Sequence, residues 1–293
     1  MIATTGFFDG VHLGHRLVIE RLVSLARERG DESLVVTFWP HPRAVLQDGA
    51  RELRLLNSLE EKKELLRALG VDRVEVLDFT RSFAALTAEQ YLREILRDRF
   101  GVTTLLMGYD NRLGSDRLTA ASLKPIADGM GMELIELSPL SFRPSEASGE
   151  ISSTQIRTAL ESGDIESAAE MLGYGYALKG VVVAGNRLGR TIGFPTANMK
   201  LYEPLKLVPG RGVYVVEAEV LGKKYRGMTN IGLRPTVGGS FTTIETHILD
   251  FDEDIYGLPL RITFLRRLRD EVHFPSLEAL KRQLEKDRDC CRE

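Results

Sequence analysis

Over residues 2–138, short apolar runs alternate with longer amphipathic segments, and this alternation constrains the fold more than any other feature. The apolar, β-rich runs lie at residues 2–5, 33–39, 73–79, 102–108 and 132–138. The segments between them carry apolar residues at helical spacing and lie at residues 15–29, 58–70, 87–101 and 121–131. Strands that alternate with helices predict an α/β domain, a Rossmann-like parallel sheet covered on both faces.

The pattern changes after Gly173. Short runs rich in Val, Tyr and Thr, split by Gly or Pro, lie at residues 176–185, 212–222, 223–232, 242–251 and 260–269. Such runs predict an antiparallel β-barrel. A terminal helix begins near Ser276, and its end, "DRDCCRE", reads as a solvated tail. We therefore predict two domains, residues 1–173 and 174–293, with helices at 152–163 and 164–173 closing the first.

Charge and composition exclude several classes of protein. The net charge of −3 predicts no nucleic-acid partner and no attraction to an acidic membrane. The two cysteines, Cys290 and Cys291, are adjacent and predict neither a disulfide framework nor a metal site. No apolar run approaches the ~20 residues of a membrane helix, and no signal-peptide pattern opens the sequence. The chain is expected to be cytoplasmic, with small-molecule substrates and no obligate protein partner.

The segment "GFFDGVHLGH" (residues 6–15) follows the first predicted strand and leads into the first helix. Ligands of parallel α/β sheets bind beyond the carboxyl ends of the strands. Gly6 permits close backbone approach, and Gly14 lies at a helix start, where free N–H groups favour phosphate. His12 and His15 offer hydrogen bonds to phosphate oxygens. A turn with two surface histidines is the alternative, but the position and the glycines favour a phosphate site.

"HLGH" resembles the HxGH signature of nucleotidyltransferases. Together with "TFWPHP" (37–42), "LLMGYDNRLG" (105–114) and "ISSTQIR" (151–157), it resembles the bacterial bifunctional riboflavin kinase/FAD synthetase family. This resemblance implies that the first domain adenylylates FMN with ATP and releases pyrophosphate. The implied ATP-binding residues of this site are Gly6, His12, Gly14, His15, Asp110, Ser153, Thr154 and Arg157, with the two histidines as catalytic residues.

One departure from the family pattern lies in "GYDNRLG", where the family usually reads G-x-D-F-x-F-G. Asn111 and Leu113 replace two aromatic residues. If those aromatics pack near the adenine or the flavin, this chain binds its substrates differently. The histidine motif and "ISST" are intact, so the resemblance still implies the adenylyl-transfer activity.

The second domain carries a glycine-rich segment that ends in "GFPTAN" (residues 193–198). It is neither a P-loop nor a dinucleotide fingerprint, and a glycine-rich β turn is the plain alternative. Thr196 and Asn198 offer hard oxygen donors suited to Mg²⁺ beside phosphates. The segment resembles the riboflavin kinase signature, which implies that Thr196 and Asn198 hold Mg-ATP. The remaining implied ATP-binding residues are Gly185, Arg190, Gly193 and Pro195.

Strand alternation in "TTIETHILDF" puts Ile244, Thr246 and Ile248 on one face and Glu245 on the other. A carboxylate there is ordinarily a solvated charge. The family resemblance instead implies that Glu245 is the general base for the riboflavin 5′-hydroxyl. Arg269 and Phe274 are expected to contact the flavin, although "LRRLRD" also fits a strand with solvated charges.

The leading hypothesis is a two-step enzyme that converts riboflavin to FMN and then FMN to FAD, with ATP and Mg²⁺. One alternative is a riboflavin kinase alone, with a weakened first site. Another is adenylyl or cytidylyl transfer to a different phosphorylated acceptor. A non-catalytic flavin-binding regulator is a third; Glu245, Thr196 and the histidine pair argue against it.

Overall fold

The computed structural model describes residues 1–46, 53–108, 111–137, 151–185, 188–236 and 239–292. The chain forms two compact units, Met1–Ser153 and Thr154–Glu293. The predicted domain limits, 1–173 and 174–293, place the division further along the chain, and they stay a prediction. Among the described residues, no helix has the length and apolar character needed to cross a membrane.

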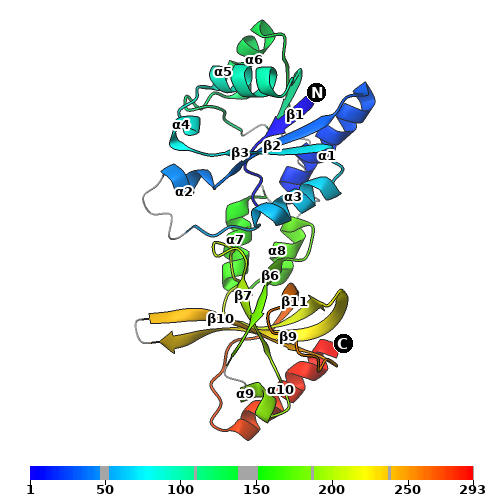
Figure 1. Cartoon of the computed structure of the whole chain (residues 1–293), viewed down its shortest axis with the longest axis vertical. Coiled ribbons are helices and arrows are strands. Elements are labelled where there is room, and N and C mark those ends of the chain that lie inside the picture. Colours follow the sequence, from blue (N-terminus) through cyan, green and yellow to red (C-terminus); the bar gives the residue numbers. More distant parts are fainter. Residues whose placement is uncertain (47–52, 109–110, 138–150, 186–187, 237–238, 293) are drawn as a thin grey trace. The chain divides into compact units, whose positions relative to one another are not determined.

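The first unit contains a five-stranded parallel sheet (Figure 1). Its strands are β1 (Ile2–Thr5), β2 (Ser33–Trp39), β3 (Arg73–Asp78), β4 (Thr104–Met107) and β5 (Glu133–Glu136). Their spatial order is β3-β2-β1-β4-β5, and all neighbours pair in parallel. The predicted parallel sheet is confirmed, and the strand order reverses direction between β1 and β4.

Helices connect these strands. They are α1 (Leu13–Arg29), α2 (Pro42–Leu46), α3 (Leu59–Ala68), α4 (Arg81–Ala84), α5 (Ala88–Gln90), η2 (Tyr91–Arg99) and α6 (Ala120–Gly129). Ser58 caps α3 by accepting a hydrogen bond from the Glu61 N–H, while the Glu61 carboxylate accepts from Ser58 N–H. The helix expected at residues 87–101 is a short α-helix followed by the π-helix η2.

Helices cover both faces of the sheet, because successive strand side chains point to opposite sides. On one face, Ile2, Val35 and Leu106 pack against α1 and α3. The opposite face presents Ala3 and Leu105 to η2 and α6. Both clusters are buried, so the sheet is held as the middle layer of this unit.

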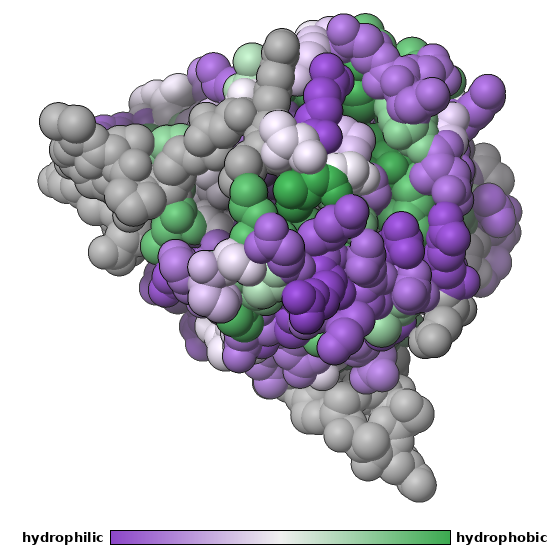
Figure 2. Space-filling model, turned by 90° about the horizontal axis from the view of Figure 1, so that it is seen from below, coloured by the Kyte–Doolittle hydropathy of each residue, from purple (hydrophilic) through white to green (hydrophobic). Residues whose placement is uncertain are grey.

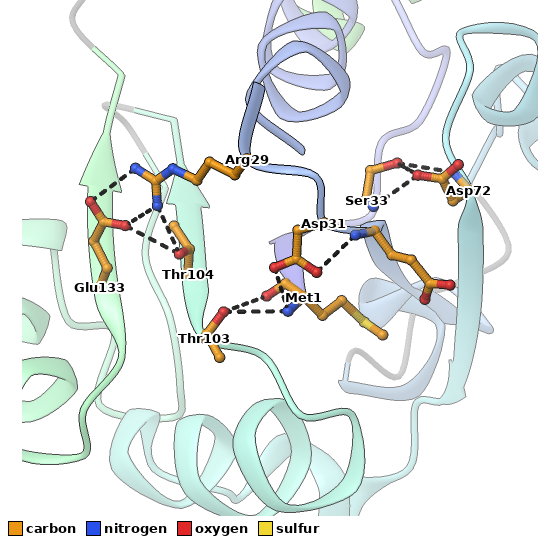
Figure 3. Close-up of polar contacts among 9 residues, drawn as sticks. Met1, Arg29, Asp31, Ser33, Asp72, Thr103, Thr104 and Glu133 are labelled. Atoms are coloured by element: carbon orange, nitrogen blue, oxygen red, sulfur yellow. Dashed lines mark hydrogen bonds and ion pairs between the residues drawn. The ribbon is translucent and has the colours of Figure 1, made fainter. Parts of the chain in front are cut away.

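Polar contacts join the strand beginnings, at the edge opposite the carboxyl ends (Figure 3). Arg29 at the end of α1 pairs with Glu133 of β5. The Met1 amine contacts Asp31 at 2.7 Å. The Asp72 carboxylate accepts hydrogen bonds from Ser33 N–H (2.9 Å) and from the Ser33 hydroxyl (2.6 Å). These contacts fix the ends of α1, β2, β3 and β5 at this edge.

Asp72→Ala should lower the free energy of unfolding of the first unit by about 1–3 kcal/mol, since the N–H and the hydroxyl proton of the buried Ser33 lose their carboxylate acceptor. Trp39 is the single tryptophan of the chain and lies on the neighbouring β2. Its fluorescence during denaturant unfolding therefore reports on this unit. Asp128→Ala, which removes only an exposed pair with Lys124, should change the value by no more than about 0.5 kcal/mol. Equal effects would contradict the assigned role of Asp72.

Two helices, α7 (Ser153–Ser162) and α8 (Ile165–Leu172), precede a closed antiparallel barrel. The barrel strands are β6 (Ala177–Val183), β7 (Ala197–Leu201), β8 (Gly212–Val220), β9 (Lys223–Thr236), β10 (Gly239–Ile248) and β11 (Pro259–Arg269). They close in the order β10-β7-β6-β11-β8-β9. The predicted barrel is confirmed.

The terminal helix α10 (Leu277–Arg292) begins after Ser276, whose hydroxyl accepts from the Ala279 N–H. It packs against the barrel through a cluster that includes Phe194, Met228 and Cys291. The expectation of a solvated tail is wrong in part: Asp287 and Cys291 are 4% and 2% exposed. The helical spacing of these two residues places both on the face that meets the barrel.

Candidate functional sites

The loop after β1 lies where the strand order of the sheet reverses, which is where ligands of such sheets bind. Gly6 begins this loop, and its N–H donates to the Val36 carbonyl at 3.1 Å. Phe8 and Val11 adopt positive φ angles of 54° and 37°. Non-glycine residues rarely take this conformation, and a β-branched one is strained by it. Such strain clusters at functional sites.

The two histidines lie together at the start of α1. His12 is the N-cap, and its Nδ1 accepts from the His15 N–H at 3.4 Å. Because an accepting ring nitrogen carries no proton, neutral His12 keeps its proton on Nε2 as a donor. The two rings stack with centroids 3.7 Å apart. A Cβ at Gly14 would lie 3.2 Å from the His12 ring, so glycine gives this ring its place over the helix start.

His15 is held as a neutral ring. Its Nδ1 is buried and has no hydrogen-bond partner among the described residues. The ring meets Phe8 edge-on, with centroids 5.3 Å apart. Burial lowers the pKa of His15 well below 6.5, and the nearby His12 and Lys62 lower it further. The site can therefore offer neutral imidazole donors at pH 7.

Of the remaining residues predicted for this site, the structure places Ser153 at the histidine loop. The Ser153 hydroxyl donates to the Asp9 carbonyl at 2.9 Å, which joins the last residue of the first unit to the histidine loop. Thr154 is exposed and Arg157 half-buried on α7, and their contribution to this site stays a prediction. Asp110 lies outside the described residues. Of the two unusual residues beside it, Leu113 packs on the core and bridges to Leu118, while Asn111 is half-buried.

Sequence reasoning missed Lys62, which is fully buried beneath the histidine loop. A signal was available, since Lys62 precedes the buried Leu66 by one helical turn on α3. It also assigned no role to Asp9, whose carboxylate accepts hydrogen bonds from the N–H groups of Leu56 and Asn57 at 3.0 and 3.3 Å. Both charges lie within the interior that supports the loop.

In the barrel, Glu245 of β10 lies between Asn198 of β7 and Asn230 of β9 in the strand register. The predicted alternation is confirmed, because Ile244, Thr246 and Ile248 are buried, whereas Glu245 is half-buried. The Thr196 hydroxyl donates to the Glu245 carboxylate at 3.4 Å. Sequence reasoning did not single out Asn230. Three polar side chains therefore share one face of three neighbouring strands.

Thr196 lines two of the cavities that open on the described part of this unit. The loop cavity, about 290 Å³, is lined by Val182, Arg190, Pro195, Thr196, Ala197, Thr246, Ile248 and residues 251–256. The helix cavity, about 590 Å³, lies between the barrel and α10. Its polar lining includes Asn230, Glu245, His247 and Arg269, and its apolar lining includes Phe194, Met228, Val272, Phe274, Leu277, Leu280 and Leu284. In the face drawn in Figure 2, a group of hydrophobic residues lies among hydrophilic ones.

The predicted ATP-binding residues surround the Thr196 turn. Gly185 follows β6, and a Cβ there would lie 2.2 Å from the Asn198 amide nitrogen, so glycine gives the Asn198 side chain its space. Arg190 is exposed on α9 (Leu188–Thr191), a short helix within the segment for which a glycine-rich β turn was the alternative. Gly193 follows this helix in the left-handed region, and Pro195 is exposed.

His247 holds the Thr196 turn from the neighbouring strand. Its Nδ1 lies 2.7 Å from the Pro195 carbonyl oxygen, so Nδ1 carries the proton and donates. The ring also contacts Phe194, with centroids 5.2 Å apart. Burial lowers the pKa of His247, which favours the neutral ring. His247 thereby fixes the turn on which Thr196 faces Glu245.

Arg269 ends β11 and lines the helix cavity with Phe274. Its guanidinium lies 5.7 Å from the Phe274 ring centroid and 2.6 Å from the buried Asp287 carboxylate. Gln283 donates a further hydrogen bond to Asp287 at 2.8 Å. The alternative of a solvated charge does not hold for Arg269. Sequence reasoning missed Asp287, which holds the guanidinium between β11 and α10.

Comparisons with known proteins match both halves of the chain. A family model described as FAD synthetase matches residues 1–155, and one described as riboflavin kinase matches residues 172–293. Residues 156–171 lie outside both matches.

Whole-chain relatives carry both descriptions. A bifunctional riboflavin kinase/FMN adenylyltransferase of Escherichia coli is 39% identical over 293 residues, covering 100% of this chain and 92% of its own. A Listeria monocytogenes protein of the same description is 38% identical, covering 98% and 90%. A crystal structure titled as a macrolide-efflux protein from Streptococcus pneumoniae superposes with a TM-score of 0.91 at 34% identity, covering 100% and 93%.

Proposed function

This chain belongs to the family of bifunctional riboflavin kinase/FMN adenylyltransferases, and we propose that its two reactions take place at the two sites described above. The enzyme phosphorylates riboflavin to FMN with ATP and adenylylates FMN to FAD. We assign the kinase reaction to the barrel and the adenylyl transfer to the histidine loop.

The observation that carries the kinase assignment is that Thr196 lines both cavities and donates to Glu245. We assign ATP to the loop cavity, where Arg190 would face the phosphates and the rings of Phe251 and Tyr256 line the space assigned to the adenine. The helix cavity, with its apolar lining, takes the isoalloxazine ring of riboflavin. The γ-phosphate and the ribityl 5′-hydroxyl then meet beside Thr196.

Glu245 acts as the general base at this meeting point. Its carboxylate accepts the proton of the 5′-hydroxyl while the hydroxyl oxygen attacks the γ-phosphorus and the bond to the β-phosphate oxygen breaks. The hydrogen bond from Thr196 orients this carboxylate, and the strand register places Glu245 between Asn198 and Asn230. Arg269 and Phe274 orient the flavin from the far side of the helix cavity.

The donor set at this turn fits Mg²⁺. Thr196 and Asn198 supply neutral hard oxygens, both side chains are half-buried, and Gly185 leaves room beside the Asn198 amide. Two protein ligands leave most of the coordination shell to phosphate oxygens and water, as magnesium prefers. Bound there, the ion would neutralise charge on the transferring phosphoryl group.

At the histidine loop, the N–H groups that begin α1 and the Nε2 donor of His12 face the α-, β- and γ-phosphates of ATP. The FMN phosphate attacks the α-phosphorus, and pyrophosphate leaves. Residues His12 and His15 stabilise the charge that develops, without a covalent intermediate. Gly6, Gly14, Asp110, Ser153, Thr154 and Arg157 complete this ATP site in our proposal.

One incubation tests both assignments together. The purified protein is given riboflavin, ATP and Mg²⁺, and the flavins are separated by chromatography over time. FMN followed by FAD is expected. FMN alone would support a kinase with a weakened first site, and neither product would leave a flavin-binding regulator. We further propose that both steps need only small molecules and proceed in the cytoplasm.

Asp287→Ala should raise the KM for riboflavin about tenfold in the kinase reaction, because Arg269 then loses the partner that holds it at the helix cavity. Steady-state kinetics with varied riboflavin measure this, and FMN adenylylation should not change. Asp289→Ala is the matched control, since Asp289 is exposed on the same helix and pairs only with Arg288 among the ion pairs described. A KM equal to that of the control would contradict the positioning role.

A further inference from the structure

The strongest feature that the two reactions leave unexplained is Lys62, a fully buried lysine on α3. We propose that Lys62 is a positioning residue of the adenylyl-transfer site, fixing through the Phe7 carbonyl the loop that presents His12 and His15. This inference rests on the assignment of that reaction to the histidine loop. It adds a residue that touches no substrate but sets the geometry of those that do.

The contacts of Lys62 converge on one backbone atom. Its Nζ donates to the Phe7 carbonyl oxygen at 2.8 Å and to Thr37 Oγ1 at 3.2 Å. The Thr37 hydroxyl donates to the same Phe7 carbonyl at 3.1 Å. The ammonium also lies 3.6 Å from the centroid of the Phe7 ring. Residue Phe7 is therefore held by α3 and β2 at the point where the chain leaves β1.

The held residue lies directly before the strained part of the loop. Phe8 and Val11 have positive φ angles, and such a conformation persists only where its surroundings determine it. The Phe8 ring is the edge-on neighbour of His15. If the Phe7 carbonyl moved, the adjoining Phe8 would move with it. The His15 ring, which Phe8 contacts, would then lose its position.

The charge of Lys62 fits the same role. Burial lowers the pKa of Lys62 to about 8, while the nearby Asp9 carboxylate stabilises the ammonium and opposes this shift. The Asp9 carboxylate accepts hydrogen bonds from the backbone N–H groups of Leu56 and Asn57. The Asp9 backbone carbonyl accepts a hydrogen bond from the Ser153 hydroxyl. Lys62 thus remains mainly protonated at pH 7, where its charge helps to keep His15 neutral.

A purely structural lysine is the competing account. A desolvated cation is costly, and an apolar side chain of similar length would fill the same space at lower cost. A costly buried charge is therefore more common where it serves a function, and titratable groups with perturbed pKa values gather at functional sites. The two accounts differ in what they predict for a variant that still folds.

The test compares Lys62→Met with Lys63→Met. Lys63 is the next residue of α3, and the contact described for it is with the Glu60 side chain. We expect Lys62→Met to reduce kcat for FMN adenylylation about 10²-fold, as a small misplacement of catalytic groups does, while riboflavin phosphorylation is unchanged. Lys63→Met should match the wild type in both reactions.

Two readouts separate positioning from loss of folding. Trp39 fluorescence measures the folded fraction of the first unit, and kcat is expressed per folded molecule. The acid limb of the adenylylation pH profile should move to higher pH in Lys62→Met, because removing the positive charge raises the pKa of His15. Thr37→Val should also lower kcat, and less than additively with Lys62→Met, since both act on the Phe7 carbonyl.

Wild-type kcat and pH profile per folded Lys62→Met molecule would overturn the inference, even if the variant is less stable. Failure of the underlying assignment looks different. If His15→Ala keeps full adenylylation, the reaction does not take place at this loop and both proposals fall. If His15→Ala loses it and folded Lys62→Met does not, only the role of Lys62 falls.

Discussion

Glu245→Gln should reduce riboflavin phosphorylation by about 10²–10⁴-fold while the conversion of FMN to FAD continues. Glutamine keeps the size of the side chain and a hydrogen-bond acceptor for the Thr196 hydroxyl, but it cannot take the proton of the 5′-hydroxyl. The measurement is the rate of FMN formation from riboflavin, with FAD formation from added FMN recorded in the same preparation.

Glu217→Gln provides a matched control for this substitution. Glu217 is also a strand carboxylate of the barrel, and it pairs with Lys224 at 2.8 Å away from both cavities. Its kinase rate should equal that of the wild type. If Glu245→Gln phosphorylated riboflavin at the control rate, the general base would have to be another group. Loss of both reactions in Glu245→Gln would contradict the separation of the two sites.

His15→Ala should give the reverse result, with FMN adenylylation reduced by about 10²–10³-fold and riboflavin phosphorylation retained. The alanine removes a ring that stacks on His12, contacts Phe8 and offers a donor where charge develops. Chromatography should then show FMN accumulating without FAD. Continued FAD formation at the wild-type rate would remove the histidine pair from the mechanism.

The depressed pKa of His15 also predicts how this unit responds to pH. Because the folded ring resists protonation, it stays neutral below 6.5, and adenylylation should persist where an ordinary histidine would be charged. Between the folded pKa and 6.5 the unfolded chain binds more protons than the folded one. The first unit should therefore lose stability as the pH falls through this window, and His15→Ala should reduce that loss.

Local sequence patterns predicted the framework of both units. The alternation of apolar runs with amphipathic segments identified the five parallel strands. Ser58 and Glu61 marked the start of α3 because a capping box is a contact within one turn. The alternation of side chains along β10 was predicted from the period of two, which puts Glu245 and the buried Thr246 on different faces of the strand.

What the sequence did not predict depends on contacts between distant residues. Lys62 and Asp287 look like surface charges of amphipathic helices, and only their partners Phe7 and Arg269 explain their burial. Asn230 and Glu245 become neighbours through strand register, which no single segment encodes. The short α9 interrupts a glycine-rich segment that carries no helical period.

The two sheets of the described chain also differ in their edge strands, because one sheet is open and the other closes into a barrel. Barrel closure gives each of β6–β11 a partner on both sides, although β10 pairs with β7 only at Glu245 and Thr246, so the rest of that side of β10 has no strand partner among the described pairings. The parallel sheet instead ends at β3 and β5, and acidic or basic side chains at Arg73, Glu75, Glu133 and Glu136 lie along these two strands. Charges on outer strands discourage intermolecular strand addition. Protection against strand addition therefore comes from closure over most of the barrel, and from charged side chains on the two outer strands of the parallel sheet.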